Sequence, residues 1–309
     1  MTISRVGLLV SSNQLREKLT HMLWQKRIGN KIRVLDTSYN YDEQNDGYKD
    51  FYQQGHIPSS VYFNPRQCSE STPHIPFNLP DTNCFTDYVQ SLGVSSDTHI
   101  VTYDRMDMRA ALRAWWLFRL YGHDNISILD GGLKKWVRDG YPVTTDEPEV
   151  ERGNFETRIN RSFMRDYDSM KEKFLRKEEP IKVDQSLMTD FDTMEETAHV
   201  TEEQIIDIRG SGAFHKTIQS DSGEQKAHIP GAKNIPYAML FNEDETFKSI
   251  EDLKEVFKKA DVDLRRPFIG MCSRGVTGCA LSAVAELLGK PTTPLYYGSW
   301  YEWSRKITQ

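Results

Sequence analysis

The chain repeats itself, and this constrains its fold more than any other feature of the sequence. In the first half "KIRVLDTSY" is followed by "GHIPSSVYFN", and in the second half "EQIIDIRGS" is followed by "AHIPGAKNIPY". Corresponding residues are 171, 172, 168 and 167 positions apart in four pairs: Asp36/Asp207, His56/His228, Asp104/Cys272 and Trp136/Trp303. An offset that stays nearly constant along both halves predicts two domains of the same fold.

Each half alternates short apolar runs with helical patterns, which favours parallel strands joined by crossover helices. The stretch after Cys272, "VTGCALSAVAELLGK", has apolar residues at helical spacing, and Gly289 supplies its end. The sequence therefore predicts an α/β fold, with a mostly parallel sheet and helices on both faces in each domain. The predicted strands are 33–35, 99–103, 126–129, 204–207, 267–271 and 293–297.

The predicted domains are 1–145 and 166–309, with a polar and charged linker at 146–165 that contains Pro148. Residues 178–203 are rich in acidic side chains and weakly patterned. We interpret this acidic stretch as a surface loop or an insertion, and an acidic docking surface is the less favoured alternative. It includes "IKVDQ", which resembles a strand, but "QIIDIR" lies at the better spacing before its histidine.

Composition excludes several classes of function. The net charge is −6 and no basic stripe is present, which argues against nucleic acid as a partner. No apolar run approaches the roughly 18 residues that a membrane span needs. The N-terminal apolar residues continue into a predicted helix, so we expect no targeting peptide and favour a cytoplasmic over a mitochondrial location.

The stretch "GMCSRGVTGCA" contains the strongest candidate for chemistry. Cys272 follows a predicted parallel strand and precedes a helix, which is where α/β folds build active sites. The N–H groups of the loop and the helix dipole would favour a thiolate. Gly275 permits a tight curl, and Arg274 adds a positive charge. We therefore predict that Cys272 is a nucleophile rather than a cysteine that only packs in the core.

The other three cysteines are not predicted to take part in chemistry. Cys279 lies inside the helical pattern and is expected to pack, while Cys68 and Cys84 lack a neighbouring base or glycine-rich turn. Four irregularly spaced cysteines suggest neither a disulfide framework nor a zinc site, and a reducing compartment is the simplest interpretation. We expect no metal and no organic cofactor.

These motifs resemble the two-domain rhodanese and mercaptopyruvate sulfurtransferase family. The resemblance rests on "GHIPSS", "AHIPGA", "RAWWLFRLYGH", "LDGGLKKW", "CSRGVT" and "YYGSWYEW", and it spans nearly the whole chain outside the acidic stretch. It implies two tandem rhodanese-like domains, of which the first is catalytically silent. In the second, the cysteine carries sulfur as a persulfide. Asp104 at the cysteine position of the first domain agrees with a single working site.

The resemblance also implies roles for residues beside Cys272. The family's Asp-Ser-Arg occurs here as Asp207-Ile208-Arg209, so that Arg209 would bind an anionic donor and Asp207 would brace the loop. A second basic residue of the family has two candidates, His215 and Lys216. The full predicted substrate-binding set is Arg209, Ser273, Arg274, Gly275, Val276 and Thr277.

The identity of the sulfur donor stays open at this stage. Thiosulfate-type loops resemble C-R-K-G-V-T, and mercaptopyruvate-type loops resemble C-G-S-G-V-T; "CSRGVT" matches neither. The family's Asp before Gly-Ser-Trp is replaced by Tyr297. We favour thiosulfate because Arg274 would stabilise the leaving sulfite, and 3-mercaptopyruvate is the alternative. The expected acceptor is cyanide, a small thiol or a thioredoxin-like protein.

His56 and its counterpart His228 are expected to be structural, although mercaptopyruvate-type members of the family give the residue equivalent to His56 a part in proton transfer. Five tryptophans, at 115, 116, 136, 300 and 303, are expected to pack in cores or interfaces. A Cdc25-type phosphatase is excluded because the arginine of Cys-x5-Arg is missing; Gly278 stands there. The remaining alternative is a non-catalytic interaction module, against which the intact cysteine loop argues.

Overall fold

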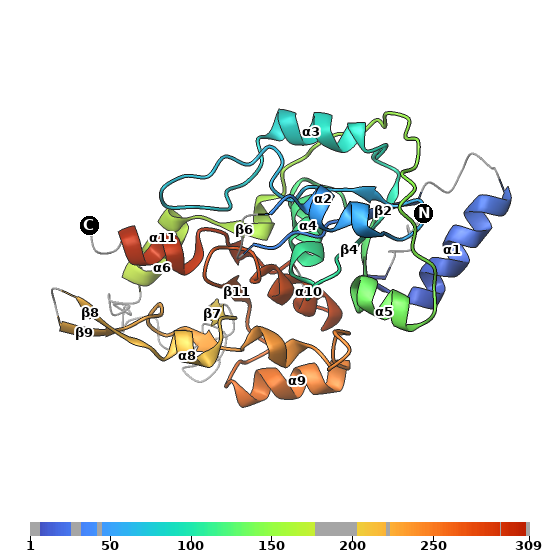
Figure 1. Cartoon of the computed structure of the whole chain (residues 1–309). Helices are drawn as coiled ribbons and strands as arrows, with labels where there is room; N and C mark the ends of the chain where they lie inside the picture. Colours follow the sequence, from blue (N-terminus) through green and yellow to red (C-terminus); the bar gives the residue numbers. More distant parts are fainter. Residues whose placement is uncertain are drawn as a thin grey trace, which may run out of the picture. The chain divides into compact units, whose positions relative to one another are not determined.

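The computed structural model describes residues 7–25, 32–41, 45–176, 203–220, 223–290 and 292–306. The chain divides into two compact units (Figure 1). Unit 1 comprises residues 1–72, 76–161 and 241–248, and unit 2 comprises 73–75, 162–240 and 249–309. The chain passes from unit 1 to unit 2 between residues 161 and 162, inside the predicted linker. "IKVDQ" and nearly all of the acidic stretch lie outside the described residues.

Unit 1 is built on a five-stranded parallel sheet with strand order β1-β5-β4-β2-β3. All residues of β4 and β5 are buried, as expected for central strands with helices on both faces. The carboxyl ends of β2 and β4 meet at one edge, where Asp36 and Tyr103 are in register. The strands are β1 (Leu9–Val10), β2 (Ile32–Asp36), β3 (Val61–Tyr62), β4 (His99–Tyr103) and β5 (Ile126–Leu129).

Helices cover both faces of this sheet. On one face, Leu15 of α1 and Trp136 of α5 share a hydrophobic cluster with Val101 of β4. On the other, Phe85 of α3 and Phe118 of α4 form an aromatic cluster with Phe155. The helices are α1 (Ser12–Gln25), α2 (Gly47–Asp50), α3 (Thr82–Ser91), α4 (Arg109–Leu120) and α5 (Gly132–Arg138), with the 3-10 turn η1 (Tyr52–Gln54).

Unit 2 repeats this plan. Its parallel sheet has the order β10-β7-β11-β12-β6, which is the order of unit 1 traversed from the other side. A separate antiparallel pair, β8–β9, stands outside the sheet. The strands are β6 (Met164–Arg165), β7 (Gln204–Asp207), β8 (Thr217–Ser220), β9 (Gly223–Lys226), β10 (Lys233–Asn234), β11 (Phe268–Met271) and β12 (Leu295–Tyr296).

The helices of unit 2 also cover both faces of its sheet. Met170 of α6 and Trp303 of α11 pack with Met271 of β11 in one cluster. Phe257 of α9 contacts Phe268 of β11. The helices are α6 (Tyr167–Arg176), α8 (Ser211–Phe214), α9 (Ile250–Lys259), α10 (Cys279–Leu287) and α11 (Ser299–Lys306), with 3-10 turns η2 (Arg161–Phe163) and η4 (Tyr237–Leu240). The matching strand orders confirm the predicted α/β class and the parallel sheets.

The prediction that Cys68 and Cys84 have no chemistry is wrong, because they form a disulfide. Cys272 and Cys279 are free thiols. The disulfide joins a loop to the first turn of α3. The two cysteines are 16 residues apart in the sequence, a spacing that does not by itself indicate a disulfide. The bond also removes the argument from cysteine usage for a reducing compartment.

The predicted linker is more ordered than a polar connecting segment suggests. Phe155 is buried against α3 and α4 of unit 1, and the amide of Ser96 donates to the carbonyl of Asn154. Residues 164–165 form β6, an edge strand of the sheet of unit 2. The segment therefore packs on unit 1 over much of its length and then enters unit 2.

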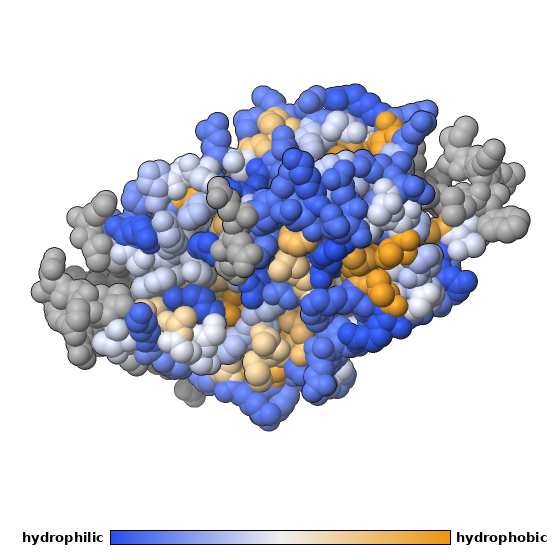
Figure 2. Space-filling model, viewed as in Figure 1, coloured by the Kyte–Doolittle hydropathy of each residue, from blue (hydrophilic) through white to orange (hydrophobic). Residues whose placement is uncertain are grey.

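The face of the molecule in Figure 2 is mostly hydrophilic, with hydrophobic residues in a few limited patches. Val137, Val143 and Ile159 are among the large apolar side chains that solvent reaches. Within the described part of the chain, no helix is both long and apolar enough to cross a bilayer.

Candidate active site

Cys272 lies at the carboxyl end of β11, the central strand of unit 2, and its side chain is buried. The backbone then curls through residues 273–278 into α10. Gly275, at φ +81°, turns its amide back so that it donates to the Cys272 sulfur at 3.1 Å. The loop therefore directs one hydrogen-bond donor at the sulfur of the predicted nucleophile.

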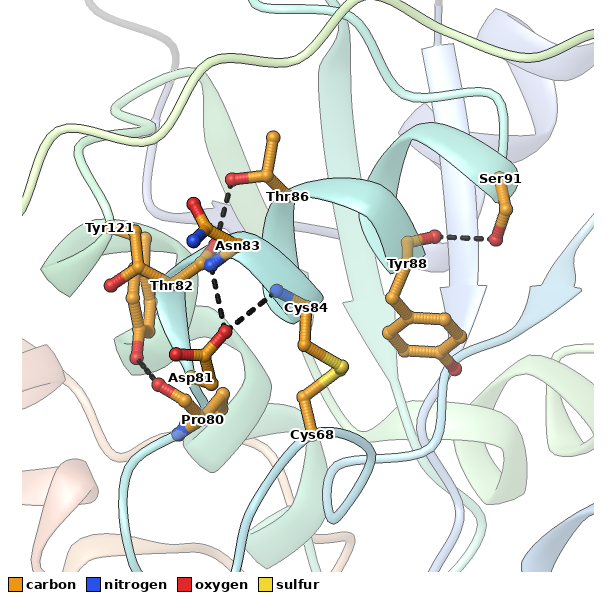
Figure 3. The surroundings of a disulfide bond; sticks show 10 residues. All are labelled: Cys68, Pro80, Asp81, Thr82, Asn83, Cys84, Thr86, Tyr88, Ser91 and Tyr121. Atoms are coloured by element: carbon orange, nitrogen blue, oxygen red, sulfur yellow. Dashed lines mark hydrogen bonds between the residues drawn. A yellow bond between two sulfur atoms is a disulfide. The ribbon is translucent and has the colours of Figure 1, made fainter.

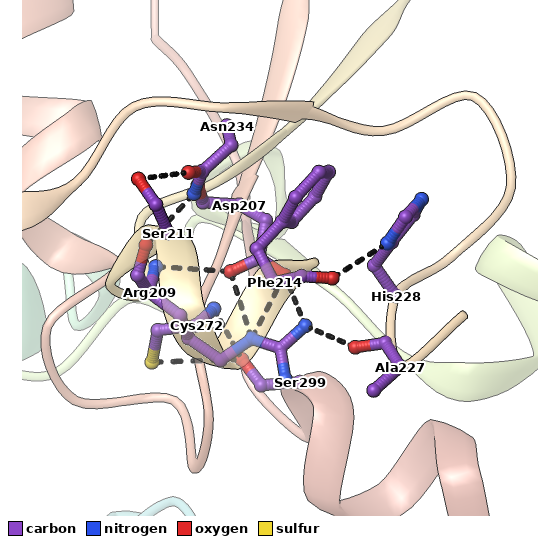
Figure 4. A network of polar contacts seen from close by, with 9 residues as sticks. All are labelled: Asp207, Arg209, Ser211, Phe214, Ala227, His228, Asn234, Cys272 and Ser299. Atoms are coloured by element: carbon purple, nitrogen blue, oxygen red, sulfur yellow. Dashed lines mark hydrogen bonds and ion pairs between the residues drawn. The ribbon is translucent and has the colours of Figure 1, made fainter. Parts of the chain in front are cut away.

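Ser299 is a site residue that the sequence reasoning missed. Its hydroxyl accepts the Cys272 amide at 3.1 Å and lies 3.8 Å from the Cys272 sulfur (Figure 4). It is held by donation to the carbonyl of Tyr296 at 2.8 Å. Ser299 has φ +55°, the same value as Gly132 at the corresponding position of unit 1. Comparing "GGLKKW" with "GSWYEW" would have marked this position as a serine in a conformation that favours glycine.

Three further amides of the cysteine loop have no acceptor in the part of the chain that the structure describes. Within the described residues, the N–H groups of Val276, Thr277 and Gly278 make no hydrogen bond. They precede the first turn of α10, where the helix dipole adds partial positive charge. A strand-to-helix loop with free amides beside a thiol is suited to binding an anion at that thiol.

The corresponding loop of unit 1 binds an anion of its own. Asp104, at the position of Cys272, is fully buried, and its carboxylate accepts four backbone amides at 2.9–3.2 Å. Burial raises the pKa of Asp104 to about 6, and the amide donors oppose a further rise. The carboxylate is therefore mostly ionised at pH 7. The amides that hold it belong to Met106, Met108, Ala110 and Ala111.

Arg209 is engaged with Asp207 at the end of β7, the strand next to β11. Its Nε lies 3.0 and 2.9 Å from the two carboxylate oxygens, and Nη2 donates to Oδ2 at 2.5 Å and to the carbonyl of Ala227 at 2.7 Å (Figure 4). The guanidinium also lies over the ring of Trp300. Both side chains are buried. Nη1 makes no hydrogen bond within the described residues, and donor binding by Arg209 stays a prediction.

Comparison with known proteins decides the family. The model of the rhodanese-like domain matches this chain twice, at residues 15–139 and at 189–306. The chain belongs to the rhodanese family. The predicted resemblance is confirmed, and the second match contains both Cys272 and Arg209.

Curated relatives of this chain carry two names. Thiosulfate sulfurtransferase of Gallus gallus is 36% identical over 279 residues, which are 90% of this chain and 88% of the relative. The 3-mercaptopyruvate sulfurtransferase of Homo sapiens is 31% identical over 280 residues, 90% and 86% of the two chains. The prediction of a sulfurtransferase agrees with both names. Because both donor classes occur at similar identity, identity alone does not choose between them.

Solved structures support the fold assignment. SseA from Escherichia coli, described as a 3-mercaptopyruvate sulfotransferase with the rhodanese fold, has a TM-score of 0.74 and 26% identity. The match covers 96% of this chain and 99% of SseA. Tum1 from Saccharomyces cerevisiae also has a TM-score of 0.74 at 23% identity, covering 97% and 96% of the chains. The prediction of two tandem rhodanese-like domains is thereby confirmed.

The two corresponding histidines, His56 and His228, have structural contacts. His56 is fully buried in unit 1, where its ring nitrogens face the carbonyls of Tyr52 at 3.0 Å and Asp146 at 3.2 Å. Its ring also stacks on Tyr52. His228 repeats this arrangement, with Nδ1 on the carbonyl of Phe214 and the ring stacked on that residue. These contacts favour the structural interpretation, and a role for His56 in proton transfer stays a prediction.

The remaining predicted residues are placed as follows. Ser273 is exposed and its carbonyl accepts the amide of Tyr301, while Arg274 is half-buried. Two candidates for a second basic residue, His215 and Lys216, follow α8 directly. Both are exposed, so their burial does not distinguish them. Cys279 is fully buried in α10, as expected of a packing residue. Among the described residues, no group of three or more His, Cys, Asp or Glu is placed to hold a metal.

Replacing Gly275 by Ala will distort the cysteine loop. The new Cβ would lie 2.0 Å from the carbonyl oxygen of Tyr297, and the backbone is in the left-handed region. We expect a loss of unfolding free energy above the roughly 1–2 kcal/mol that left-handed strain alone costs, together with slower alkylation of Cys272. Denaturant unfolding and the rate of labelling by iodoacetamide would measure the two effects.

Gly289→Ala is the matched control. Gly289 has φ +72° but no atom within 4 Å of the added Cβ, so it carries the strain without the clash. It should cost only the strain itself, about 1–2 kcal/mol, and leave the alkylation of Cys272 unchanged. Equal losses of stability in the two variants, with Cys272 alkylated at the wild-type rate in both, would contradict this prediction. The close packing of Gly275 on Tyr297 would then not determine the conformation of the cysteine loop.

Proposed function

We propose that this protein is a sulfurtransferase that moves sulfane sulfur from thiosulfate to a thiophilic acceptor through a persulfide on Cys272. The observation that carries the proposal is the cysteine loop, in which the amide of Gly275 lies 3.1 Å from the sulfur. The amides of the next three residues have no acceptor among the described residues. Asp104 supports it, because the equivalent loop of unit 1 holds an anion through four amides.

The chemistry takes place in two displacements. The Cys272 thiolate attacks the outer sulfur of thiosulfate, the S–S bond breaks, and sulfite leaves with the electron pair. An acceptor nucleophile then attacks the outer sulfur of the persulfide and returns Cys272 as thiolate. In both steps negative charge shifts between sulfur atoms near the loop, where preoriented amides stabilise it without reorganisation. Ser299 holds the backbone of Cys272 through these steps by accepting its amide.

We propose thiosulfate rather than 3-mercaptopyruvate as the main donor. A carboxylate donor needs a two-pronged grip, and the Nε and Nη2 donors of Arg209 are engaged with Asp207. Thiosulfate is compact enough to be held by the loop amides, by Arg274 and by the remaining Nη1 of Arg209. One residue favours the alternative donor, 3-mercaptopyruvate. Ser273 is exposed beside Cys272, and its hydroxyl would exchange a proton with the thiol of that substrate.

Arg274→Ser should lower kcat/KM for thiosulfate by about tenfold, which corresponds to about 1.4 kcal/mol, and leave turnover of 3-mercaptopyruvate equal or improved. One charge beside the leaving sulfite in a partly solvated site is worth about 1–2 kcal/mol. Steady-state kinetics with each donor would measure this. Arg265→Ser is the control, because it removes an exposed arginine before the opposite end of β11. An equal loss with both donors would contradict the proposed role.

The direct test of function is to incubate the purified protein with each donor and measure thiocyanate formation that depends on cyanide. Thiosulfate should give the higher kcat/KM. A far higher kcat/KM with 3-mercaptopyruvate would reverse the choice of donor, and no thiocyanate with either donor would favour a non-catalytic interaction module. Replacing cyanide by a small thiol or a thioredoxin-like protein then ranks the proposed acceptors. A cytoplasmic location remains a prediction that imaging of the tagged chain would test.

A further inference from the structure

The disulfide between Cys68 and Cys84 closes the neck of a loop in the first half of the chain (Figure 3). Next to the bond, the amide of Asp81 donates to the carbonyl of Cys68 at 2.9 Å, and Ser69 forms an antiparallel bridge with Pro80. These contacts bring the two ends of loop 69–80 together. The end of the loop on the Cys84 side is fixed to α3, whose N-cap is Asp81.

The backbone at Cys68 needs to be held in place. Its φ of +67° lies in the left-handed region, which residues other than glycine disfavour. A non-glycine residue persists there when its surroundings impose that conformation. The disulfide supplies a covalent constraint at this position, and a reduced Cys68 could relax to an ordinary conformation.

The pair is placed to exchange with solvent thiols. Cys84 is exposed and Cys68 is half-buried, so a small reductant can reach the bond. Cys84 is the third residue of α3, and its amide donates to Asp81.

The middle of the loop is assigned to unit 2, the unit that carries Cys272. Although the loop starts and ends in unit 1, its residues Pro73–Ile75 group with unit 2. Residues 70–73 are exposed. At one side, Phe77 is tied to unit 1, because Arg113 donates to its carbonyl at 3.1 Å. Opening the neck therefore frees the segment that leads from Cys68 to residues 73–75.

We propose that Cys68 and Cys84 form a redox-responsive clasp, which a dithiol reductant opens, and that the clasp regulates sulfur transfer by ordering or releasing loop 69–80. The regulatory part rests on the proposed function. One thiolate of the reductant attacks a sulfur of the pair, the S–S bond breaks, and the released cysteine takes up a proton. The second thiol then resolves the mixed disulfide. The clasp gains two electrons and two protons, and the reductant leaves as its disulfide.

The first experiment follows the loop itself and needs no activity. Full-length Cys272→Ser protein is digested with a Glu-specific protease before and after treatment with dithiothreitol, and cleavage after the exposed Glu70 is measured by mass spectrometry. Cleavage after Glu149, which is exposed in the segment that follows α5, is the internal control. We expect reduction to raise cleavage at Glu70 at least about tenfold, because local opening governs proteolysis, and to leave Glu149 unchanged.

Two results of that experiment would overturn the clasp. One is the absence of a Cys68–Cys84 linked peptide from the untreated protein. The other is equal cleavage at Glu70 in both redox states. The double variant Cys68→Ser/Cys84→Ser should cleave like reduced protein without any reductant, and this separates the clasp from other effects of dithiothreitol.

The second experiment tests regulation. With Cys272 intact, the same double variant should show kcat/KM for thiosulfate lowered about fivefold, which is about 1 kcal/mol by conversion. Cys279→Ser provides a control for loss of a cysteine elsewhere. Faster cleavage with unchanged turnover would refute regulation while leaving the clasp. A wild-type protein without any sulfur transfer would refute the proposed function instead, and the cleavage assay would still decide the clasp.

Discussion

Cys272→Ser should abolish sulfur transfer, with kcat falling by at least about a thousandfold, because a serine hydroxyl cannot form or release a persulfide. Treatment of the wild-type protein with thiosulfate should add one sulfur atom, and peptide mass spectrometry should place it on Cys272. The reason is geometric. This sulfur receives an amide at 3.1 Å and lies beside three amides that have no acceptor in the described chain.

Cys279→Ser is the control for this prediction. Cys279 is the other free thiol, one helical turn after Gly275, and it is fully buried in α10. Its replacement should leave turnover within about twofold of wild type, since it packs rather than reacts. If the added sulfur were found on Cys279, or if Cys272→Ser retained most of its turnover, the assignment of the nucleophile would be wrong.

Arg209→Leu should destabilise unit 2 by about 3–5 kcal/mol, because it leaves the carboxylate of Asp207 buried without its partner. Asp207 is fully buried, and Arg209 supplies three of the contacts to its oxygens from Nε and Nη2. Chemical denaturation, followed by a probe within unit 2, would measure the loss. Arg209→Lys keeps the charge but not the forked geometry, so it should lose part of that stability and raise KM for thiosulfate.

A double-mutant cycle separates the structural role of Arg209 from donor binding. Asp207→Asn combined with Arg209→Leu removes both charges, so the pair should lose less stability than the sum of the single variants. If Arg209→Leu alone cost under about 1 kcal/mol, the value typical of exposed ion pairs, the pair with Asp207 would not brace the site. An unchanged KM in Arg209→Lys would in turn argue against donor binding through Nη1.

The sequence by itself determined the elements that repeat. Regular offsets between Asp36/Asp207 and Trp136/Trp303 predict two copies of one sheet, and both copies have the same strand order. The local sequence also predicts the position of Cys272 in the fold. An apolar strand pattern ends just before it and a Gly-containing helix start follows, and the structure has β11 and α10 at these places. Strand periodicity and glycine turns act over a few residues, and for that reason they can be recognised in one sequence.

Only the tertiary structure decided which distant groups meet. The resemblance predicts that Arg209 binds a donor, and only the fold shows that its guanidinium also contacts Asp207 and a carbonyl 18 residues away. Ser299 reaches the amide of Cys272 from 27 residues along the chain because β11 and β12 are neighbours in the sheet. Cys68 meets Cys84 because α3 begins beside it. Such contacts depend on which strands and helices pack together, a choice made by burial across the whole domain and not by any local spacing of residues.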